Sequence, residues 1–315
     1  MDYLVSIVIC TADRPSTLKT TLESLEKLTY PHIEVIVIDG SSNNETINLI
    51  KGIFQNFKFS NKFSITDKKN ISVSRNLGIN LAFGEIIAFI DDDAVPPSDW
   101  IENLLLPYFR YGAKCAGTGG TVRDMTKTGY PLQYNRGISN VVSDTIPIRL
   151  DNSNSYNDSQ GWWYNSLMGA NSSYRKEALQ EINGYDEFFE YFLDETDVCL
   201  RLIQAGYQIH YSDVVVDHYP QPSHNRQDQK HLTCWYSLSK NTTYFALKHA
   251  LNKIPLPIIC IRLAFLLTYR CFLRIIRLKF THNLSNKLIW QYFKESFGGI
   301  RLGWIAGLDF HRNPT

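Results

Sequence analysis

The sequence predicts an α/β protein with one mostly parallel central sheet and a helical C-terminal extension. Short apolar runs alternate with amphipathic segments four times within about the first 110 residues, which is typical of parallel strands joined by crossover helices. Acidic residues directly follow several of these runs. After residue 230 the chain is strongly apolar and basic, and we expect it to be helical.

The first half of the chain supplies most of the expected elements. Continuous runs rich in β-branched residues predict buried strands at 4–10, 33–38 and 85–90, with further strands near 63–66 and at 113–122. Pro15 opens a predicted helix because leucines then recur at helical spacing at Leu18, Leu22, Leu25 and Leu28. Further helices are expected after residue 42, at 71–82 and at 98–110.

The second half is less regular. Residues 124–160 are rich in Asn, Ser and Asp, so we expect a loop-rich insertion there and a candidate mobile flap. Helices are predicted at 174–182 and 194–205, and a strand at 207–216. We divide the chain into a first domain, 1–225, with halves at about 1–122 and 123–225, and a helical basic and apolar extension, 226–315.

Composition limits the function classes. The apolar fraction of 44% and charged fraction of 20% argue against wholesale disorder. Residues 1–240 carry 21 Lys and Arg against 29 Asp and Glu, whereas residues 241–315 carry 11 against 2, so a net charge of −8 is followed by one of +9. The six cysteines form no CxxC pair and are interpreted as reduced thiols. No basic and then apolar leader opens the sequence, so we expect a cytoplasmic location.

Three consecutive aspartates, Asp91, Asp92 and Asp93, follow a predicted buried strand. Such a concentration of negative charge is unfavourable without a cation, and divalent metals prefer carboxylate oxygens. In an extended segment, Asp91 and Asp93 point the same way while Asp92 faces elsewhere. The alternative is a solvated acidic turn before the next helix.

Two further carboxylates, Asp13 and Asp39, each follow a strand at the same predicted edge, where doubly wound folds bind nucleotides. Each is equally well explained as part of a helix cap or turn. Arg75 near the start of a helix suits phosphate or base contacts, or it is an ordinary surface residue.

A second acidic group, Asp194-Glu195-Thr196-Asp197, opens a predicted helix. Asp194 and Asp197 have structural explanations as a capping pair, and Asp197 can also pair with Arg201. Glu195 lies above the apolar face of the helix, a position that suits a catalytic base in a cleft. We therefore favour Glu195 over Asp194 as the base.

These motifs together resemble family 2 glycosyltransferases, which have the GT-A fold, over about residues 4–220. The resemblance lies in the opening strand Val5–Thr11, the turn Val37-Ile38-Asp39-Gly40-Ser41-Ser42, the helix Ser74–Ile79 with Ala82–Glu85, and the Asp91–Asp93 run as a DxD motif. It also lies in Gly169-Ala170-Asn171 and Gly184–Glu187 before the acidic helix. Asp194-Glu195 stands where the family has Glu-Asp, which leaves the choice of base open between the two. His218, a lone histidine by itself, stands where many members have a further metal ligand.

The resemblance implies an inverting transfer from a nucleoside-diphosphate sugar to an acceptor hydroxyl, in assembly of a bacterial polysaccharide or glycolipid. Mn²⁺ or Mg²⁺ would be held by Asp91, Asp93 and His218, with Glu195 or Asp194 as the base. Donor-binding candidates are Thr11, Asp13, Asp39, Arg75, Asp91, Asp92, Gly169 and Asn171. Trp162 and Trp163 are candidates for stacking on an acceptor sugar, or equally for core packing. UDP-sugars are favoured as donors over dTDP- or GDP-sugars, and the acceptor is a glycan or a lipid-linked glycan.

Two other classes compete. A nucleotidyltransferase would also use carboxylates and a metal, but it gives no reason for Glu195. A non-catalytic carbohydrate-binding relative would be expected to lack the DxD motif or the base. No Walker A motif or GxGxxG occurs, which argues against ATPase and dinucleotide-binding functions.

The segment 254–280 is apolar but interrupted by arginines. Arg262 and Arg270 argue against a membrane-spanning helix. Arg270, Arg274 and Arg277 are predicted to share one face beside an apolar one, which fits a helix lying on a membrane surface. A helix packed on the first domain or a homodimer contact is the alternative. We expect no nucleic-acid partner, and a location peripheral to the inner face of the cell membrane.

Overall fold

A computed structural model describes residues 2–147, 156–222 and 234–312. The chain forms two compact units, which are described separately. Unit 1 comprises residues 1–138, 146–187 and 194–221, and unit 2 comprises residues 139–145, 188–193 and 222–315. The chain therefore passes between the units several times, and two of these passages flank the segment 188–193.

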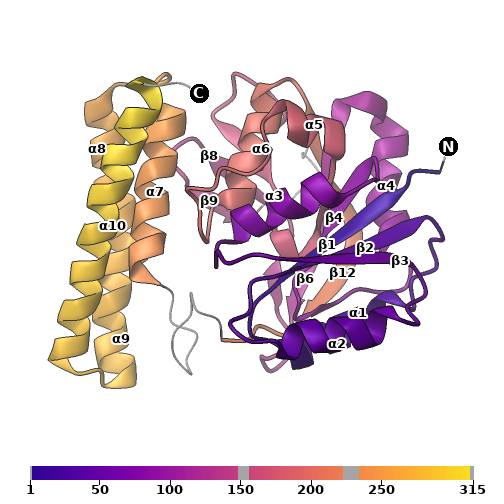
Figure 1. The fold of residues 1–315 in the computed structure, drawn as a ribbon. Coiled ribbons are helices and arrows are strands. Elements are labelled where there is room, and N and C mark those ends of the chain that lie inside the picture. Colours follow the sequence, from indigo (N-terminus) through magenta and orange to yellow (C-terminus); the bar gives the residue numbers. More distant parts are fainter. Residues whose placement is uncertain (1, 148–155, 223–233, 313–315) are drawn as a thin grey trace. The chain divides into compact units, whose positions relative to one another are not determined.

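Unit 1 is built on a nine-stranded sheet whose first part is parallel (Figure 1). Its strands lie in the order β3-β2-β1-β4, and each neighbouring pair is parallel. They are β1 (Val5–Thr11), β2 (Ile33–Asp39), β3 (Ser60–Ile65) and β4 (Ile86–Phe89), joined by α1 (Pro15–Leu25), α2 (Glu45–Phe54) and α3 (Ile71–Leu81). The inner strands are almost wholly buried because helices cover both faces of the sheet (Figure 1). This part of the fold confirms the sequence prediction.

The second part of the sheet is mixed. Strand β11 (Ser172–Arg175) runs antiparallel between β4 and β6 (Cys115–Asp124), and β6 pairs in parallel with β12 (Gln208–His218). The predicted helix 174–182 is wrong at its start, because α5 (Lys176–Glu181) begins only after this strand. Tyr174 is fully buried in β11, and Gly117 of β6 makes room for it: a Cβ there would lie 2.9 Å from the Tyr174 ring. A polar and aromatic tetrapeptide can therefore be a central strand.

The insertion predicted at 124–160 is only partly loop. It contains β7 (Leu132–Tyr134), which pairs with β6, followed by β8 (Gly137–Asn140) and β9 (Thr145–Pro147). Residues 148–155 of the predicted flap lie outside the described residues. The other elements of unit 1 are β5 (Ala94–Val95), α4 (Trp100–Tyr111), η1 (Gly112–Lys114), β10 (Trp163–Ser166), η3 (Gly169–Asn171) and α6 (Asp194–Gln204).

Unit 2 contains the helices expected in the C-terminal part of the chain. They are α7 (Trp235–Ala250), α8 (Leu256–Leu267), the π-helical turn η4 (Thr268–Leu273), α9 (Arg274–His282) and α10 (Asn286–Arg312). Helices α7 and α10 meet backbone to backbone through glycines of α10. A Cβ at Gly299 or Gly303 would lie 2.2 Å from the carbonyl oxygen of Tyr236 or Lys240. Side chains larger than hydrogen would force these helices apart.

The π-helical turn η4 overturns the predicted basic stripe. A π turn adds a residue to the helical repeat, so residues before and after it do not keep α-helical spacing. Arg270 turns inward and donates to the hydroxyl and carbonyl oxygens of Ser143, which also belongs to unit 2. Arg274 and Arg277 remain exposed. The three arginines therefore do not share one exposed face.

The helical run Leu256–His282 has 27 residues and a mean hydropathy of 1.8 over its most apolar window. By length and composition it could cross a membrane, so the two arginines alone do not exclude a span. Its burial is one-sided, however. Ile259, Leu263, Cys271 and Ile275 are buried within the protein, whereas the opposite side leaves apolar residues exposed. Such a helix is suited to lie along an interface rather than to cross alone.

Candidate functional site

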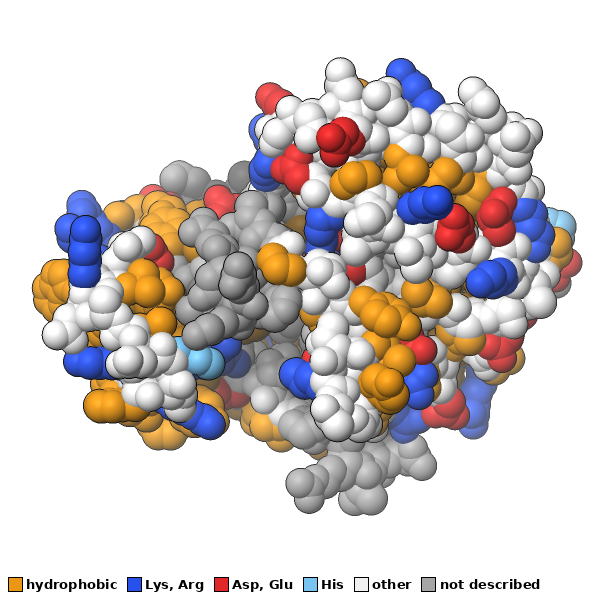
Figure 2. Space-filling view, turned by 90° about the horizontal axis from the view of Figure 1, so that it is seen from below, with side chains coloured by type: hydrophobic (Ala, Val, Ile, Leu, Met, Phe, Trp, Pro, Cys, Tyr) orange, Lys and Arg blue, Asp and Glu red, His pale blue; other side chains and the backbone are white. Residues whose placement is uncertain are grey.

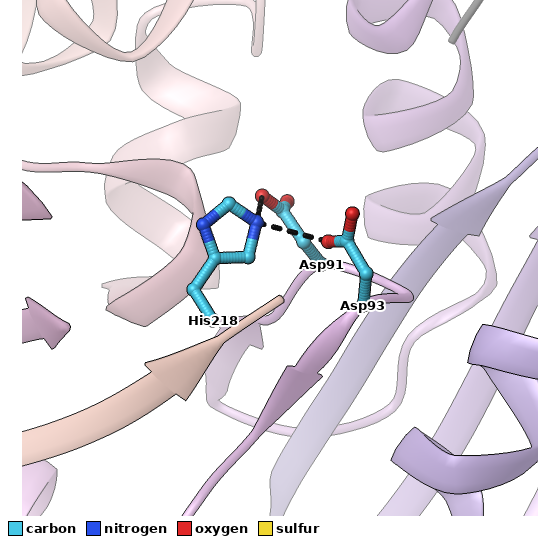
Figure 3. Close-up of side chains that lie close together, drawn as sticks. All are labelled: Asp91, Asp93 and His218. Carbon is cyan, nitrogen blue, oxygen red and sulfur yellow. Dashed lines mark hydrogen bonds and ion pairs between the residues drawn. The ribbon is translucent and has the colours of Figure 1, made fainter. Parts of the chain in front are cut away.

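The Asp91–Asp93 turn and the end of β12 bring a histidine and two carboxylates together (Figure 3). Nε2 of His218 lies 2.9 Å from Oδ1 of Asp93 and 3.7 Å from Oδ2 of Asp91. Their candidate ligand atoms all lie within 4.8 Å of one another. Two carboxylates and an imidazole form a donor set that suits Mn²⁺ and accommodates Mg²⁺. The three residues named by the sequence as metal ligands are thus adjacent.

Gln133 of β7 orients this histidine. Its Oε1 lies 2.7 Å from Nδ1 of His218. A proton on Nδ1 can be donated to this carbonyl oxygen, which leaves the Nε2 lone pair available to a cation that the two carboxylates also bind, as in protein metal sites generally. Sequence reasoning missed Gln133 because it lies in the irregular insertion, where no periodic pattern marks it.

Asp92 lies outside the group of Asp91, Asp93 and His218. Its carboxylate accepts a hydrogen bond from Thr11 at 2.6 Å and forms an ion pair with Arg14 at 2.6 Å. Burial raises the pKa of Asp92 to about 7, although the charge of Arg14 opposes the shift. Arg14 also contacts Asp93 at 3.0 Å, so this one arginine holds both carboxylates. Sequence reasoning missed Arg14, which directly follows Asp13.

The end of β2 carries a carboxylate with an unused oxygen. Oδ1 of Asp39 accepts from the backbone N–H of Ser41 at 2.9 Å, whereas the buried Oδ2 has no partner among the described residues. Asp13 lies close by, with a left-handed φ of 57°, and accepts from the N–H of Ser42 and from Lys69. These contacts with Lys69 and Ser42 lower the pKa of Asp13. Asp13 and Asp39 therefore both contact the Ser41-Ser42 turn, and each follows a strand, β1 or β2, as the sequence analysis expected.

Arg75 lies between the two acids that open α6. Its guanidinium donates to Asp194 and lies 2.8 Å from Oε1 of Glu195. Arg75 and Asp194 are almost fully buried, whereas the Glu195 side chain is 20% exposed. The sequence suggested a phosphate or base contact for Arg75; the structure pairs it with the acids instead.

This ion-pair network makes the two acids unequal. Burial and the adjacent Glu195 charge raise the pKa of Asp194 well above its usual range. Burial also opposes ionisation of Glu195, but the Arg75 charge outweighs it and lowers the pKa of Glu195. Glu195 is thus the more exposed and the more readily ionised of the two.

Gly169 of η3 lies directly against this network. A Cβ at this position would be 2.1 Å from a guanidinium nitrogen of Arg75 and 2.2 Å from Oε1 of Glu195. Only glycine permits so close an approach without displacement of these side chains. The backbone at Gly169 therefore covers the pair.

The remaining predicted residues lie apart from these contacts. The amide of Asn171 is engaged by the fold: it accepts from Trp100 and donates to the carbonyls of Thr121 and Val214. Trp162 and Trp163 are half-buried at the start of β10. Ion pairing of Asp197 with Arg201 at 2.7 Å confirms the predicted structural role of that pair.

Residues 6–182 match the family described as glycosyl transferase family 2. The chain belongs to this family. Residues 153–225 also match the family described as the N-terminal domain of galactosyltransferase. The region matched to family 2 includes β1 to β4 and the Asp91–Asp93 run.

Relatives and solved structures agree with this membership. The glucosyl-dolichyl phosphate glucuronosyltransferase of Haloferax volcanii is 28% identical over 223 residues, covering 66% of each chain. Mannosyltransferase PcManGT from Pyrobaculum calidifontis, in complex with GDP-Man and Mn²⁺, superposes with a TM-score of 0.57 at 14% identity, covering 99% of this chain and 88% of that one. GalNAc-T7 with UDP, GalNAc and Mn²⁺ gives 0.60 at 16% identity, covering 78% and 48%. These likenesses establish a GT-A fold. The chain spans two thirds or less of the curated relatives it matches first.

Proposed function

We propose that this chain is an inverting, metal-dependent glycosyltransferase that moves a sugar from a nucleoside-diphosphate sugar to an acceptor hydroxyl. The observation that carries the proposal is the presence, in unit 1, of a metal-type donor set together with a partly exposed carboxylate, Glu195, that pairs with Arg75. Burial raises the pKa of Asp91, and the charges of Arg75 and Glu195 also act on this carboxylate.

Asp91, Asp93 and His218 would hold Mn²⁺ or Mg²⁺, which supplies positive charge against the diphosphate leaving group. Arg14 keeps the Asp93 carboxylate in place from its other side. The unpartnered Oδ2 of Asp39 is suited to accept a hydrogen bond from the nucleoside, and Asp13 would border the same subsite. We favour a UDP-sugar as donor. PcManGT with GDP-Man and GalNAc-T7 with UDP support a nucleotide-sugar as the donor, although their nucleobases differ.

Glu195 would act as the general base. Its carboxylate accepts the acceptor O–H proton while the oxygen forms a bond to the anomeric carbon from the face opposite the leaving group. The bond from that carbon to the diphosphate oxygen breaks, and the nucleoside diphosphate leaves with the electron pair. Arg75 keeps Glu195 ionised, and the buried Asp194 completes the pairing of Arg75.

We further propose a lipid-linked glycan as acceptor and a location peripheral to a membrane. The named substrates of two relatives are a dolichyl phosphate and a diphosphoundecaprenol glycolipid. Unit 2 supports the location because apolar side chains and cations share its surface (Figure 2). Trp162 and Trp163, half-exposed at β10, remain candidates for acceptor contact.

The test is a panel of UDP-, dTDP- and GDP-sugars incubated with the full chain. We expect release of a nucleoside diphosphate that stops with chelator and returns with Mn²⁺ or Mg²⁺. Asp93→Asn should abolish metal-dependent donor binding measured by calorimetry. Release of pyrophosphate would instead identify a nucleotidyltransferase, and full turnover in chelator would exclude the metal.

A further inference from the structure

The segment Phe188–Leu193 belongs to unit 2, although the residues on both sides of it belong to unit 1. It leads directly into α6, whose first two residues are Asp194 and Glu195. The chain therefore enters unit 2 and leaves it again immediately before the proposed base. Whatever holds this segment also fixes one end of the peptide that carries Glu195.

Two adjacent side chains of α7 hold the segment. The Asn241 amide donates to the carbonyl oxygens of Tyr191 at 2.5 Å and Phe192 at 3.1 Å. Lys240 donates to the carbonyl of Phe188 at 2.9 Å and forms an ion pair with Glu190 at 3.2 Å.

Both α7 side chains are buried, with Lys240 only 2% exposed. A buried lysine is uncommon unless its charge is paired, and among the described residues the side-chain partners of Lys240 come from the segment 188–193. Lys240 and Asn241 are thus the α7 side chains directed at this segment.

The end of the segment has an unusual backbone. Phe192 and Leu193 both have left-handed conformations, with φ of 73° and 71°. Bulky non-glycine residues rarely adopt this conformation, and it persists only where surrounding contacts enforce it. Here those contacts are the Asn241 hydrogen bonds and the burial of Leu193. Relaxation of either residue would rotate the peptide that enters α6.

Helix α7 is itself fixed in unit 2. Gly303 of α10 packs on the carbonyl oxygen of Lys240, the residue that reaches the segment. The ring of Phe189 packs against Tyr244 with centroids 5.2 Å apart, one turn further along α7. The segment is therefore held by polar and aromatic contacts from α7, and the Arg270 guanidinium of η4 also lies over the Phe192 ring.

We propose that Lys240 and Asn241 are positioning residues for the transfer step: they hold the segment Phe188–Leu193 so that Glu195 is presented to the acceptor hydroxyl. The inference rests on the proposed function of Glu195. It gives two residues of α7 a part in the transfer step. It also predicts that loss of these contacts impairs transfer but not donor binding, since the donor-side residues Asp39, Asp91 and Asp93 lie elsewhere in the chain.

The test is Asn241→Leu, which keeps approximate shape and removes the amide donors. We expect kcat for transfer to fall about 10²-fold, the scale of a misplacement near 1 Å, with unchanged metal-dependent donor affinity. In a Glu195→Gln background the same change should have almost no further effect, because both act on one step. Thr242→Val is the matched control, since it changes the next buried residue of α7, whose hydroxyl has no hydrogen-bond partner among the described residues.

Amide hydrogen exchange at residues 191–195 provides a readout that needs no activity. Asn241→Leu should accelerate it, and Thr242→Val should not. Lys240→Met removes the other contact and serves if Asn241→Leu does not fold. Unchanged kcat and unchanged amide exchange in a folded variant would overturn the inference. So would an Asn241→Leu variant that lowers kcat by the same factor in the Glu195→Gln background as in the unaltered chain. Absence of transfer by the unaltered chain would instead refute the proposed function, and the exchange result would still decide whether α7 holds the segment.

Discussion

Arg75 contacts both candidates for the catalytic base, Asp194 and Glu195, and the two acids differ in their exposure and in the direction of their pKa shifts. It is buried with Asp194 against its guanidinium, while Glu195 keeps part of its carboxylate accessible. A base must be ionised before the reaction and reachable by the acceptor. Glu195 therefore fits the proposed role of base better than Asp194, which is buried and whose pKa is raised.

Replacement of Glu195 by Gln should lower the transfer rate about 10²–10⁴-fold while donor binding survives, because the amide keeps the shape but cannot accept a proton. The pH dependence has a definite sign. The pKa of Glu195 is lowered, so the base stays ionised as pH falls to the ordinary glutamate value of about 4.3 and loses activity only below it. Initial rates and donor affinity across pH would check both points. An unchanged rate for Glu195→Gln would transfer the role to Asp194.

The site residues that directly follow strand ends could be predicted from the sequence. The residues that contact them from other parts of the chain could not. Asp91, Asp93 and His218 could be grouped because a parallel sheet brings strand ends to one edge. The pairing of Arg75 with α6 could not, since it depends on how segments more than 100 residues apart pack. Gln133 could not be predicted because it lies in the irregular insertion, where no periodic pattern marks it.

Among the elements, the short turn η3 has an exacting role. It brings the backbone of Gly169 so close to Arg75 and Glu195 that no side chain fits between them. This is a close approach and not a matter of backbone conformation, because Gly169 does not have a positive φ. The turn thereby limits where the guanidinium and the carboxylate can lie.

Gly169→Ala should therefore displace the Arg75–Glu195 pair and lower transfer about 10²-fold, with metal-dependent donor binding less affected. Steady-state rates and donor calorimetry measure the two effects. Gly52→Ala is the control: it lies in α2 with open space around it, and alanine there should be neutral or stabilise by up to about 1 kcal/mol. Equal transfer rates for the two variants would contradict the assigned role of η3.

Most elements could be predicted from periodicity, and the exceptions have physical causes. The strand β11 (Ser172–Arg175) was not predicted, and a helix was expected at 174–182, because this segment has no apolar run. The glycines of β6 make room for this strand in the sheet. The predicted basic stripe is wrong because the π-helical turn η4 changes the helical repeat, and the spacing of the arginines in the sequence does not reveal this change. Both depend on packing between distant segments.

For the whole molecule, charge and exposed apolar surface coincide in the C-terminal helices. The net charge of −8 in residues 1–240 contrasts with +9 in residues 241–315. In the described part of unit 2, exposed apolar residues include Ile261, Phe265, Tyr269, Leu273, Phe280, Trp290, Phe297 and Ile305. Figure 2 shows Lys and Arg among the apolar side chains of these helices. An exposed apolar face beside cations is suited to anionic lipid, to which both contribute binding energy.

Flotation with vesicles tests this membrane surface. The unaltered chain should float with anionic vesicles at low salt and less with neutral vesicles or at high salt, because ions screen exposed cations. Phe265→Asp with Phe280→Asp should abolish flotation, since each side chain is 77% exposed and would bury in the interface. Phe83→Asp is the matched control, at 78% exposure in unit 1. A soluble monomer that does not bind anionic vesicles would refute the proposed membrane surface. If the unaltered chain is a dimer and the double variant is a monomer, the apolar face would instead be assigned to contact with a second copy of the chain.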